Sequence, residues 1–216
     1  MVTPARPLAS GRDCDVFALA DGRVVRWYKD RRSAEGEAEL IRAVHALGYP
    51  VPRVDEWDGP RIVMERIDGP TLGEQLLGGA VSADDGAAVQ AELQGRLHGL
   101  RWPGAGSGES LLHLDFHPFN VLMGPAGPVV IDWTNARPGP PGLDVAMSAL
   151  ILAGVALTLE FPEARDLLTA YGAAAPAAYA EHLDEAARIR NGKQHTTVEE
   201  RAVMGQAMAL AREAHA

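Results

Sequence analysis

Two aspartates and an asparagine near the middle of the chain have the types and the spacing that phosphoryl transfer needs. Asp115 lies in the segment HLDFHPFN at residues 113–120, which ends at Asn120, and Asp132 follows twelve residues later. Transfer of a phosphoryl group to a hydroxyl needs a carboxylate to accept the hydroxyl proton and oxygen ligands to hold Mg²⁺ on the phosphates. The pattern therefore makes Asp115 the candidate base and makes Asn120 and Asp132 the candidate metal ligands.

A predicted β-hairpin would bring the two candidate metal ligands together. Short apolar runs at residues 121–123 and 129–131 flank a turn that contains glycine and proline. Such a hairpin folds the chain back on itself. We therefore expect Asp132, at the end of the second run, to lie beside Asn120.

The segment before residue 66 is predicted to be rich in strands. The strand patterns cover residues 15–19, 23–28, 54–57 and 61–65, and an Asp-Gly dipeptide joins the first two as a hairpin. Between the two pairs, Ser33 is the predicted N-cap of a helix that stops at Gly48. Its apolar stripe is predicted at Leu40, Val44 and Leu47. The predicted order is β-β-α-β-β.

After residue 70 the pattern is mainly helical. Ser82, with Asp85 three residues later, predicts the start of a helix, and its buried face is expected at Val89, Leu93, Leu97 and Leu100. From residue 143 onward the chain reads as helices with breaks near Pro162, Pro176 and Asn191-Gly192. The apolar stretch at residues 145–159 is shorter than the roughly 20 residues that span a bilayer, so it is predicted to be a buried helix.

Composition and charge narrow the function classes. The chain has 216 residues, 20 basic and 29 acidic, for a formal charge of −9. This balance disfavours nucleic acid as a partner and favours a cationic substrate. The alternative is that the negative charge only keeps the protein soluble. A single cysteine, Cys14, excludes an internal disulfide framework, and residues 1–7 have no apolar run typical of a signal peptide. We expect a cytoplasmic protein that does not bind membranes.

Segment 113–132 resembles the catalytic and metal-binding loops of the aminoglycoside phosphotransferase family, which is similar to choline kinases, homoserine kinases and, more distantly, protein kinases. The segment VMERIDG at residues 63–69 resembles the hinge of that family, and Leu97-His98 precedes the catalytic loop as in the family. The resemblance implies an α+β, two-lobe protein-kinase-like fold. Residues 1–65 would form a nucleotide-binding lobe, 66–70 a hinge, and 71–216 a mainly helical catalytic and substrate-binding lobe.

The same resemblance implies roles for single residues. Arg26 would meet the α- and β-phosphates and Glu37 would pair with it, while Val24, two residues away on the same strand face, would cover the adenine. The remaining implied contacts are backbone groups of Glu65 and Ile67 with the base, Gly11 in the phosphate loop, His117 near the γ-phosphate, and Asp144 bracing the catalytic loop. The loop has only one glycine, and Arg26 stands where lysine is more usual, so altered nucleotide handling is expected.

The predicted reaction moves the γ-phosphoryl group of ATP or GTP, with Mg²⁺, to a hydroxyl of a small molecule. Aminoglycosides and amino alcohols are candidate acceptors, and the protein would be a monomer or a homodimer. Two alternatives stay open. The glycine-poor loop fits a non-catalytic, kinase-like nucleotide-binding module, and the triplet His113-x-Asp115-x-His117 fits a His/Asp metallohydrolase.

Overall fold

The computed structural model describes residues 6–11, 13–158, 163–192 and 196–215. Its contacts divide the chain into two compact units. Unit 1 consists of Met1–Pro70 and Leu122–Thr134, and unit 2 consists of Thr71–Val121 and Asn135–Ala216. The hairpin that carries Asp132 therefore groups with the first 70 residues, and the division of the chain at residues 65 and 70 stays a prediction.

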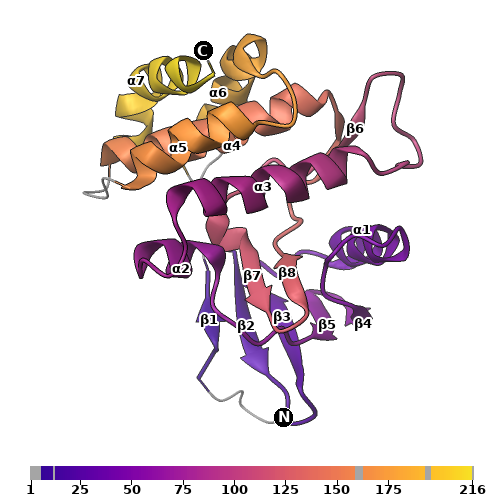
Figure 1. The fold of residues 1–216 in the computed structure, drawn as a ribbon. Coiled ribbons are helices and arrows are strands. Elements are labelled where there is room, and N and C mark those ends of the chain that lie inside the picture. The colour runs from indigo at the N-terminus through magenta and orange to yellow at the C-terminus, as the bar shows by residue number, and fades with distance from the viewer. Residues whose placement is uncertain (1–5, 12, 159–162, 193–195, 216) are drawn as a thin grey trace. The chain divides into compact units, whose positions relative to one another are not determined.

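Unit 1 is built on a five-stranded antiparallel sheet (Figure 1). The strands are β1 (Ala9–Ser10), β2 (Cys14–Ala18), β3 (Arg23–Tyr28), β4 (Val54–Asp58) and β5 (Arg61–Glu65). They lie in the order β1-β2-β3-β5-β4. The four predicted strands are confirmed, each within one residue of its expected ends, and the short β1 is an addition.

Strand β3 carries the side chains that matter most in unit 1. Val24, Arg26 and Tyr28 are buried, whereas Trp27 between them is exposed. Successive side chains of a strand point to opposite faces. The predicted shared face of Val24 and Arg26 is therefore confirmed.

Helix α1 (Glu35–Ala46) differs in detail from its prediction. Its N-cap is Ala34 and not Ser33, and its buried residues are Glu37, Ala38, Ile41 and Val44. Of the expected stripe, Leu40 is half-buried and Leu47 is exposed. Of the predicted stripe only Val44 is buried, and the helix turns Glu37, Ala38 and Ile41 inward with it. The predicted end at Gly48 is confirmed, since Gly48 has the left-handed φ of 78° that ends helices.

The predicted hairpin after residue 120 is present as β7 (Val121–Gly124) and β8 (Gly127–Val130). The Met123 amide donates to the Pro70 carbonyl, and the Val130 amide donates to the Pro50 carbonyl, both at 2.8 Å. Trp133, just beyond β8, is almost fully buried, with its ring edge-on to Tyr49. These contacts make the hairpin part of the core of unit 1.

Unit 2 is mainly helical (Figure 1). Its helices are α2 (Leu72–Leu77), α3 (Ala83–His98), α4 (Pro141–Thr158), α5 (Glu163–Ala174), α6 (Leu183–Gly192) and α7 (Val198–Ala214), with the 3-10 turns Pro118–Asn120 and Ala180–His182. A two-stranded sheet pairs β6 (Ser110–Leu112) with β9 (Arg137–Gly139). Ser82 caps α3 as predicted, accepting a hydrogen bond from the Asp85 amide at 3.1 Å. The expected break at Pro162 lies outside the described residues.

Helix α4 forms the core of unit 2. Every residue from 142 to 153 is buried, which confirms the predicted buried helix over its described part. Within the described part of the chain, α4 alone has the length and apolar composition of a membrane span, and two-thirds of it is buried against the protein. That degree of burial is typical of a core helix.

Candidate active site

The segment 113–120 is a loop of unit 2 whose backbone is held in an unusual conformation. Leu114 has a φ of 59°, in the left-handed region that non-glycine residues rarely adopt. Its amide donates to Asp144 Oδ1 at 2.6 Å, and the His113 amide donates to the same oxygen at 3.1 Å. Strain of this kind is found mainly at functional sites. The two hydrogen bonds are what Asp144 contributes to the shape of the loop.

Asp144 is fully buried and accepts two further hydrogen bonds at its other oxygen. Gln94 Nε2 and His98 Nε2 both lie 2.9 Å from Oδ2. Burial alone raises the pKa of a carboxyl, but the hydrogen bonds and charge of His98, with those from Gln94 and Leu114, hold the pKa of Asp144 below its usual range. Asp144 is therefore an ionised buried group with all its lone pairs engaged.

The predicted base and one predicted metal ligand lie together in this loop. The Asn120 side chain donates through Nδ2 to the Asp115 carbonyl at 2.9 Å and to His117 Nε2 at 3.2 Å. Because the amide nitrogen is used inside the loop, only the amide oxygen of Asn120 is a candidate metal ligand. Asp115 is half-buried, so part of its surface is open to solvent.

His113 has a different position from its neighbours in the sequence. Its side chain is fully buried, with the ring 5.3 Å from that of Phe116 in an edge-on arrangement. Asp115 and His117 are only half-buried. Among the described residues, no three His, Cys, Asp or Glu side chains gather into a group that could hold a metal. The structure therefore gives the metallohydrolase alternative no ligand cluster.

In unit 1, Arg26 is the centre of a charged cluster. Its Nη1 donates to Glu37 Oε1 at 2.5 Å, and its Nη2 donates to Asp132 Oδ1 at 2.8 Å and to Thr134 Oγ1 at 3.1 Å. Its Nε donates to Cys14 Sγ at 3.0 Å. A planar guanidinium can make all these bonds at once, whereas a lysine ammonium cannot. The cluster thus depends on arginine at this position.

The charges of the cluster depend on one another. Burial disfavours the charged form of Arg26, but Glu37 and Asp132 outweigh burial and raise the pKa of the guanidinium. Burial raises the pKa of Glu37, and Arg26 counteracts that rise. Burial also raises the pKa of the Cys14 thiol, against the opposing charge of Arg26. Cys14 is therefore a neutral acceptor at pH 7.

Asp132, the second predicted metal ligand, stands at the accessible side of this cluster. It has a φ of 66°, and 40% of its side chain is exposed. The Thr134 hydroxyl donates to its Oδ1 at 3.0 Å, and the following residue, Trp133, donates its amide to Glu37 Oε1 at 3.1 Å. Two neighbouring contacts thus fix the backbone and the carboxylate of Asp132.

The predicted phosphate loop is closed by its own contacts. The Gly11 amide donates to the Cys14 carbonyl at 2.9 Å. Lys29 Nζ donates to the Gly11 carbonyl at 2.6 Å and to Ser10 Oγ at 3.1 Å, and it pairs with Asp15 at 3.1 Å. Lys29 therefore ties this loop together through contacts with Ser10, Gly11 and Asp15.

The backbone groups predicted to meet a base lie at the end of β5, in Glu65, and just beyond it, in Ile67. The Glu65 amide donates to the Arg53 carbonyl at 2.8 Å, so only the carbonyl of Glu65 could meet a base edge. Val24 pairs with Met64 in the sheet and is buried. Ile67 lies close to Gly124 of β7. Val24, Glu65 and Ile67 all belong to unit 1.

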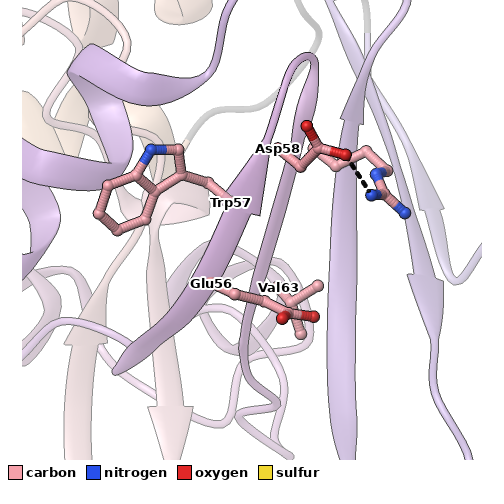
Figure 2. Close-up of a pocket in the computed structure, with 5 residues that line it drawn as sticks. Glu56, Trp57, Asp58 and Val63 are labelled. Carbon is pink, nitrogen blue, oxygen red and sulfur yellow. Dashed lines mark hydrogen bonds and ion pairs between the residues drawn. The ribbon is translucent and has the colours of Figure 1, made fainter.

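A pocket on the β4–β5 hairpin contains none of the predicted site residues. Glu56, Trp57, Asp58, Arg61 and Val63 line it. Asp58 pairs with Arg61 at 2.8 Å, and Figure 2 shows Glu56 close to Val63, its register partner. The pocket is therefore separate from the cluster around Arg26 and from the loop 113–120.

The structure assembles the predicted residues as two groups. Unit 1 brings Arg26, Glu37 and Asp132 together, and unit 2 brings Asp115, His117 and Asn120 together. Since Asn120 and Asp132 belong to different units, their predicted approach stays a prediction. Sequence reasoning missed Thr134, Gln90 and Gln94. The glutamines could have been found from their spacing, since Gln90, Gln94 and His98 follow one another at intervals of four residues. No pattern in the sequence pointed to Thr134.

The sequence profile described as the phosphotransferase enzyme family matches residues 74–182, a range that includes the loop 113–120 and Asp144. A search of curated protein sequences gives no match.

Several solved structures share the fold. The ADP-bound aminoglycoside phosphotransferase APH(2'')-Ib is 18% identical, with a TM-score of 0.59 over 97% of this chain and 93% of that one. A choline/ethanolamine kinase family protein from Mesorhizobium loti is 16% identical, with a TM-score of 0.60 over 98% and 88%. The amicoumacin kinase hAmiN, in complex with AMP-PNP, Ca²⁺ and Ami, is 12% identical, with a TM-score of 0.59 over 96% and 87%.

These similarities confirm the predicted α+β kinase-like fold, with a β-rich N-terminal sheet and a helical C-terminal part. They also confirm the resemblance to aminoglycoside phosphotransferases and choline kinases. Since the family profile spans half of the sequence and contains the loop that carries Asp115 and Asn120, the chain belongs to the phosphotransferase enzyme family.

Proposed function

We propose that the protein is a kinase that transfers the γ-phosphoryl group of ATP or GTP to a hydroxyl of a small molecule. The observation that carries the proposal is the loop around Asp115. It lies inside the segment matched by the family profile, and side chains of Asp144 and Asn120 hold its backbone at consecutive residues. A carboxylate on a loop held this firmly suits a base, since bases act at fixed positions.

In the proposed reaction, Asp115 accepts the proton of the substrate hydroxyl. The substrate oxygen bonds to the γ-phosphorus while the bond from that phosphorus to the β–γ bridging oxygen breaks. The products are a phosphate ester and a nucleoside diphosphate, and the proton stays on Asp115 until solvent takes it. Arg26 would neutralise phosphate charge, since Glu37 and Asp132 keep its guanidinium charged and hold it in place.

The donor atoms suit Mg²⁺. Mg²⁺ prefers oxygen ligands and usually binds one or two carboxylates together with water and substrate phosphates. The Asp132 carboxylate and the Asn120 amide oxygen are such ligands, and they would hold the ion. When bound, Mg²⁺ supplies charge neutralisation on the phosphates. Arg26 would share Asp132 with the ion, so ion binding and the Arg26–Asp132 pair are expected to compete.

We propose which residues would contact the nucleotide and which chemical classes of acceptor the protein would use. Val24, the Glu65 carbonyl and Ile67 would contact the base, Gly11 would lie at the phosphates, and His117 would lie near the γ-phosphate. The structural neighbours bound to ADP or AMP-PNP support nucleotide use. Aminoglycosides and amino alcohols are the proposed acceptors, since the chain carries a net charge of −9 and such compounds are cations. We further propose a cytoplasmic monomer or homodimer that binds neither nucleic acid nor membranes.

A non-catalytic nucleotide-binding module is the second candidate. The observation in its favour is the phosphate loop, where the Gly11 amide is used in a turn and is not directed at a ligand. Under that reading Asp115 would have no proton to accept.

One experiment separates the two candidates. Purified protein is assayed for phosphate transfer to a panel of aminoglycosides, amino alcohols and sugars, and Asp115→Asn is compared with the wild type. Kinase function predicts turnover that the substitution lowers at least about 100-fold while nucleotide binding is retained. Nucleotide binding without turnover on the whole panel would establish the module and refute the kinase.

A further inference from the structure

We infer that Gln90 and Gln94 of helix α3 are positioning residues for Asp115. The inference rests on the proposed role of Asp115 as the base. Neither glutamine touches the reacting atoms in the proposed reaction. Each acts through the backbone on one side of Asp115.

Both glutamines lie in a place where a helix normally buries apolar side chains. Gln90, Gln94 and His98 are spaced four residues apart and so share one face of α3, and the two glutamines are fully buried. Burial of an amide costs free energy unless its hydrogen bonds are made. Both amide atoms of Gln94 are bonded, whereas Oε1 of Gln90 has no hydrogen-bond partner among the described residues. A core that served packing alone would do better with leucine at these positions, and the hydrogen bonds from the two Nε2 atoms are the contacts that leucine could not make.

Gln90 holds the residue after Asp115. Its Nε2 donates to the carbonyl oxygen of Phe116 at 3.3 Å, in a buried environment. Phe116 is itself buried, and Asp115 precedes it directly. This bond fixes the peptide plane through which the chain leaves Asp115.

Gln94 acts on the residue before Asp115 through Asp144. Its Nε2 donates to Asp144 Oδ2 at 2.9 Å and to Ser148 Oγ at 3.2 Å. Its Oε1 accepts a hydrogen bond from the Tyr171 hydroxyl of α5. This bond orients the amide so that its Nε2 faces Asp144. Asp144 then holds the Leu114 amide with its other oxygen.

Side chains of α3 thus hold a backbone group on each side of Asp115, the Leu114 amide through Asp144 and the Phe116 carbonyl directly. Leu114 on one side adopts a left-handed φ of 59°, which costs a non-glycine residue roughly 1–2 kcal/mol. Such a conformation persists only where the surroundings enforce it. If Gln94 no longer orients Asp144, or Gln90 no longer holds Phe116, Leu114 can relax and Asp115 moves with it.

The test compares Gln94→Leu and Gln90→Leu with Leu93→Val, a control on the same helix that alters packing and removes no side-chain hydrogen bond. Tyr171→Phe, which removes only one hydroxyl, serves as a milder variant that folds if Gln94→Leu does not. Two measurements are made on the full chain. One is hydrogen–deuterium exchange of the peptide that contains residues 113–116, and the other is kcat and the nucleotide KM below the onset of unfolding.

The inference predicts faster exchange in this peptide, by about tenfold or more for Gln94→Leu, and a smaller effect for Tyr171→Phe. It also predicts a kcat about 10- to 100-fold lower with nucleotide KM little changed, while Leu93→Val alters neither. Unchanged exchange and kcat in both glutamine variants would overturn it, since a purely structural role lowers stability alone. If the wild type phosphorylates nothing on the panel, the proposed function fails, and the exchange comparison still decides whether the glutamines hold the loop.

Discussion

Replacement of Asp144 by asparagine should destabilise unit 2 by an amount that the structure allows us to work out. The carboxylate accepts four hydrogen bonds, from the amides of His113 and Leu114 and from the side chains of Gln94 and His98. Asparagine has one oxygen, which can keep the two backbone bonds, and its amino group would then face two donors. Loss of two hydrogen bonds to a charged group costs about 3–6 kcal/mol.

Two effects reduce that figure. The variant no longer buries a charge, and the side chains around the new amino group can shift so that fewer donors face one another. We therefore expect a loss of about 3 kcal/mol in the free energy of unfolding, which corresponds to a decrease in Tm of roughly 6–12 °C. Asp184→Asn, at an exposed carboxylate in the first turn of α6, is the matched control and should change stability by less than about 1 kcal/mol.

The difference between wild type and Asp144→Asn should depend on pH in one direction. The folded-state pKa of Asp144 is lowered from 3.8, so its ionised form stabilises the fold above the unfolded-state pKa, and this contribution is lost as the pH falls toward the folded-state value. Urea unfolding followed by circular dichroism at pH 7, 5, 4 and 3 measures the effect. A difference of zero at pH 7, or one that grows between pH 5 and pH 3, would refute the reasoning.

Three further experiments test single features of the structure. Arg26→Lys should lower kcat/KM for nucleotide about 10- to 100-fold in a steady-state assay, because lysine cannot keep the several bonds of the guanidinium; wild-type kinetics would contradict this. Cys14 should react with iodoacetamide at pH 7.5 at least about tenfold more slowly than in urea-unfolded protein, because burial raises its pKa; equal rates would show an accessible thiolate. Gly142→Ala should destabilise the fold by more than about 2 kcal/mol, since its Cβ would overlap a backbone carbonyl oxygen. Gly154→Ala, with open space around it, should stabilise the fold by about 0.5–1 kcal/mol. Chemical denaturation measures both free energies of unfolding, and similar effects of the two substitutions would argue against the packing described.

The sequence predicted what depends on local pattern and on residue type. The strands of unit 1 follow from the alternation of side chains and from the turn residues between them. The loop around Asp115 was predictable because the chemistry needs a carboxylate and an amide near each other. In each case a few neighbouring residues contain the information.

What the sequence did not reveal depends on tertiary environment. The buried face of α1 includes Glu37, whose burial makes sense only once Arg26 lies opposite it. In the same way, Gln90 and Gln94 look like surface residues of an amphipathic helix until Phe116 and Asp144 are placed against them. A pattern of apolar residues predicts the apolar part of a core. It does not identify polar side chains that are buried because they form hydrogen bonds with a distant segment.

The membership of the β7–β8 hairpin in unit 1 has a consequence for synthesis of the chain. A ribosome releases residues in order, so the first 70 residues emerge long before Leu122–Thr134, which belong to the same compact unit. Until residue 134 is available, Arg26 lacks Asp132, and the core lacks Trp133. A fragment that ends at Pro70 should therefore be an incomplete fold that exposes apolar surface, and unit 1 would have to be produced by joining the two segments with a designed linker.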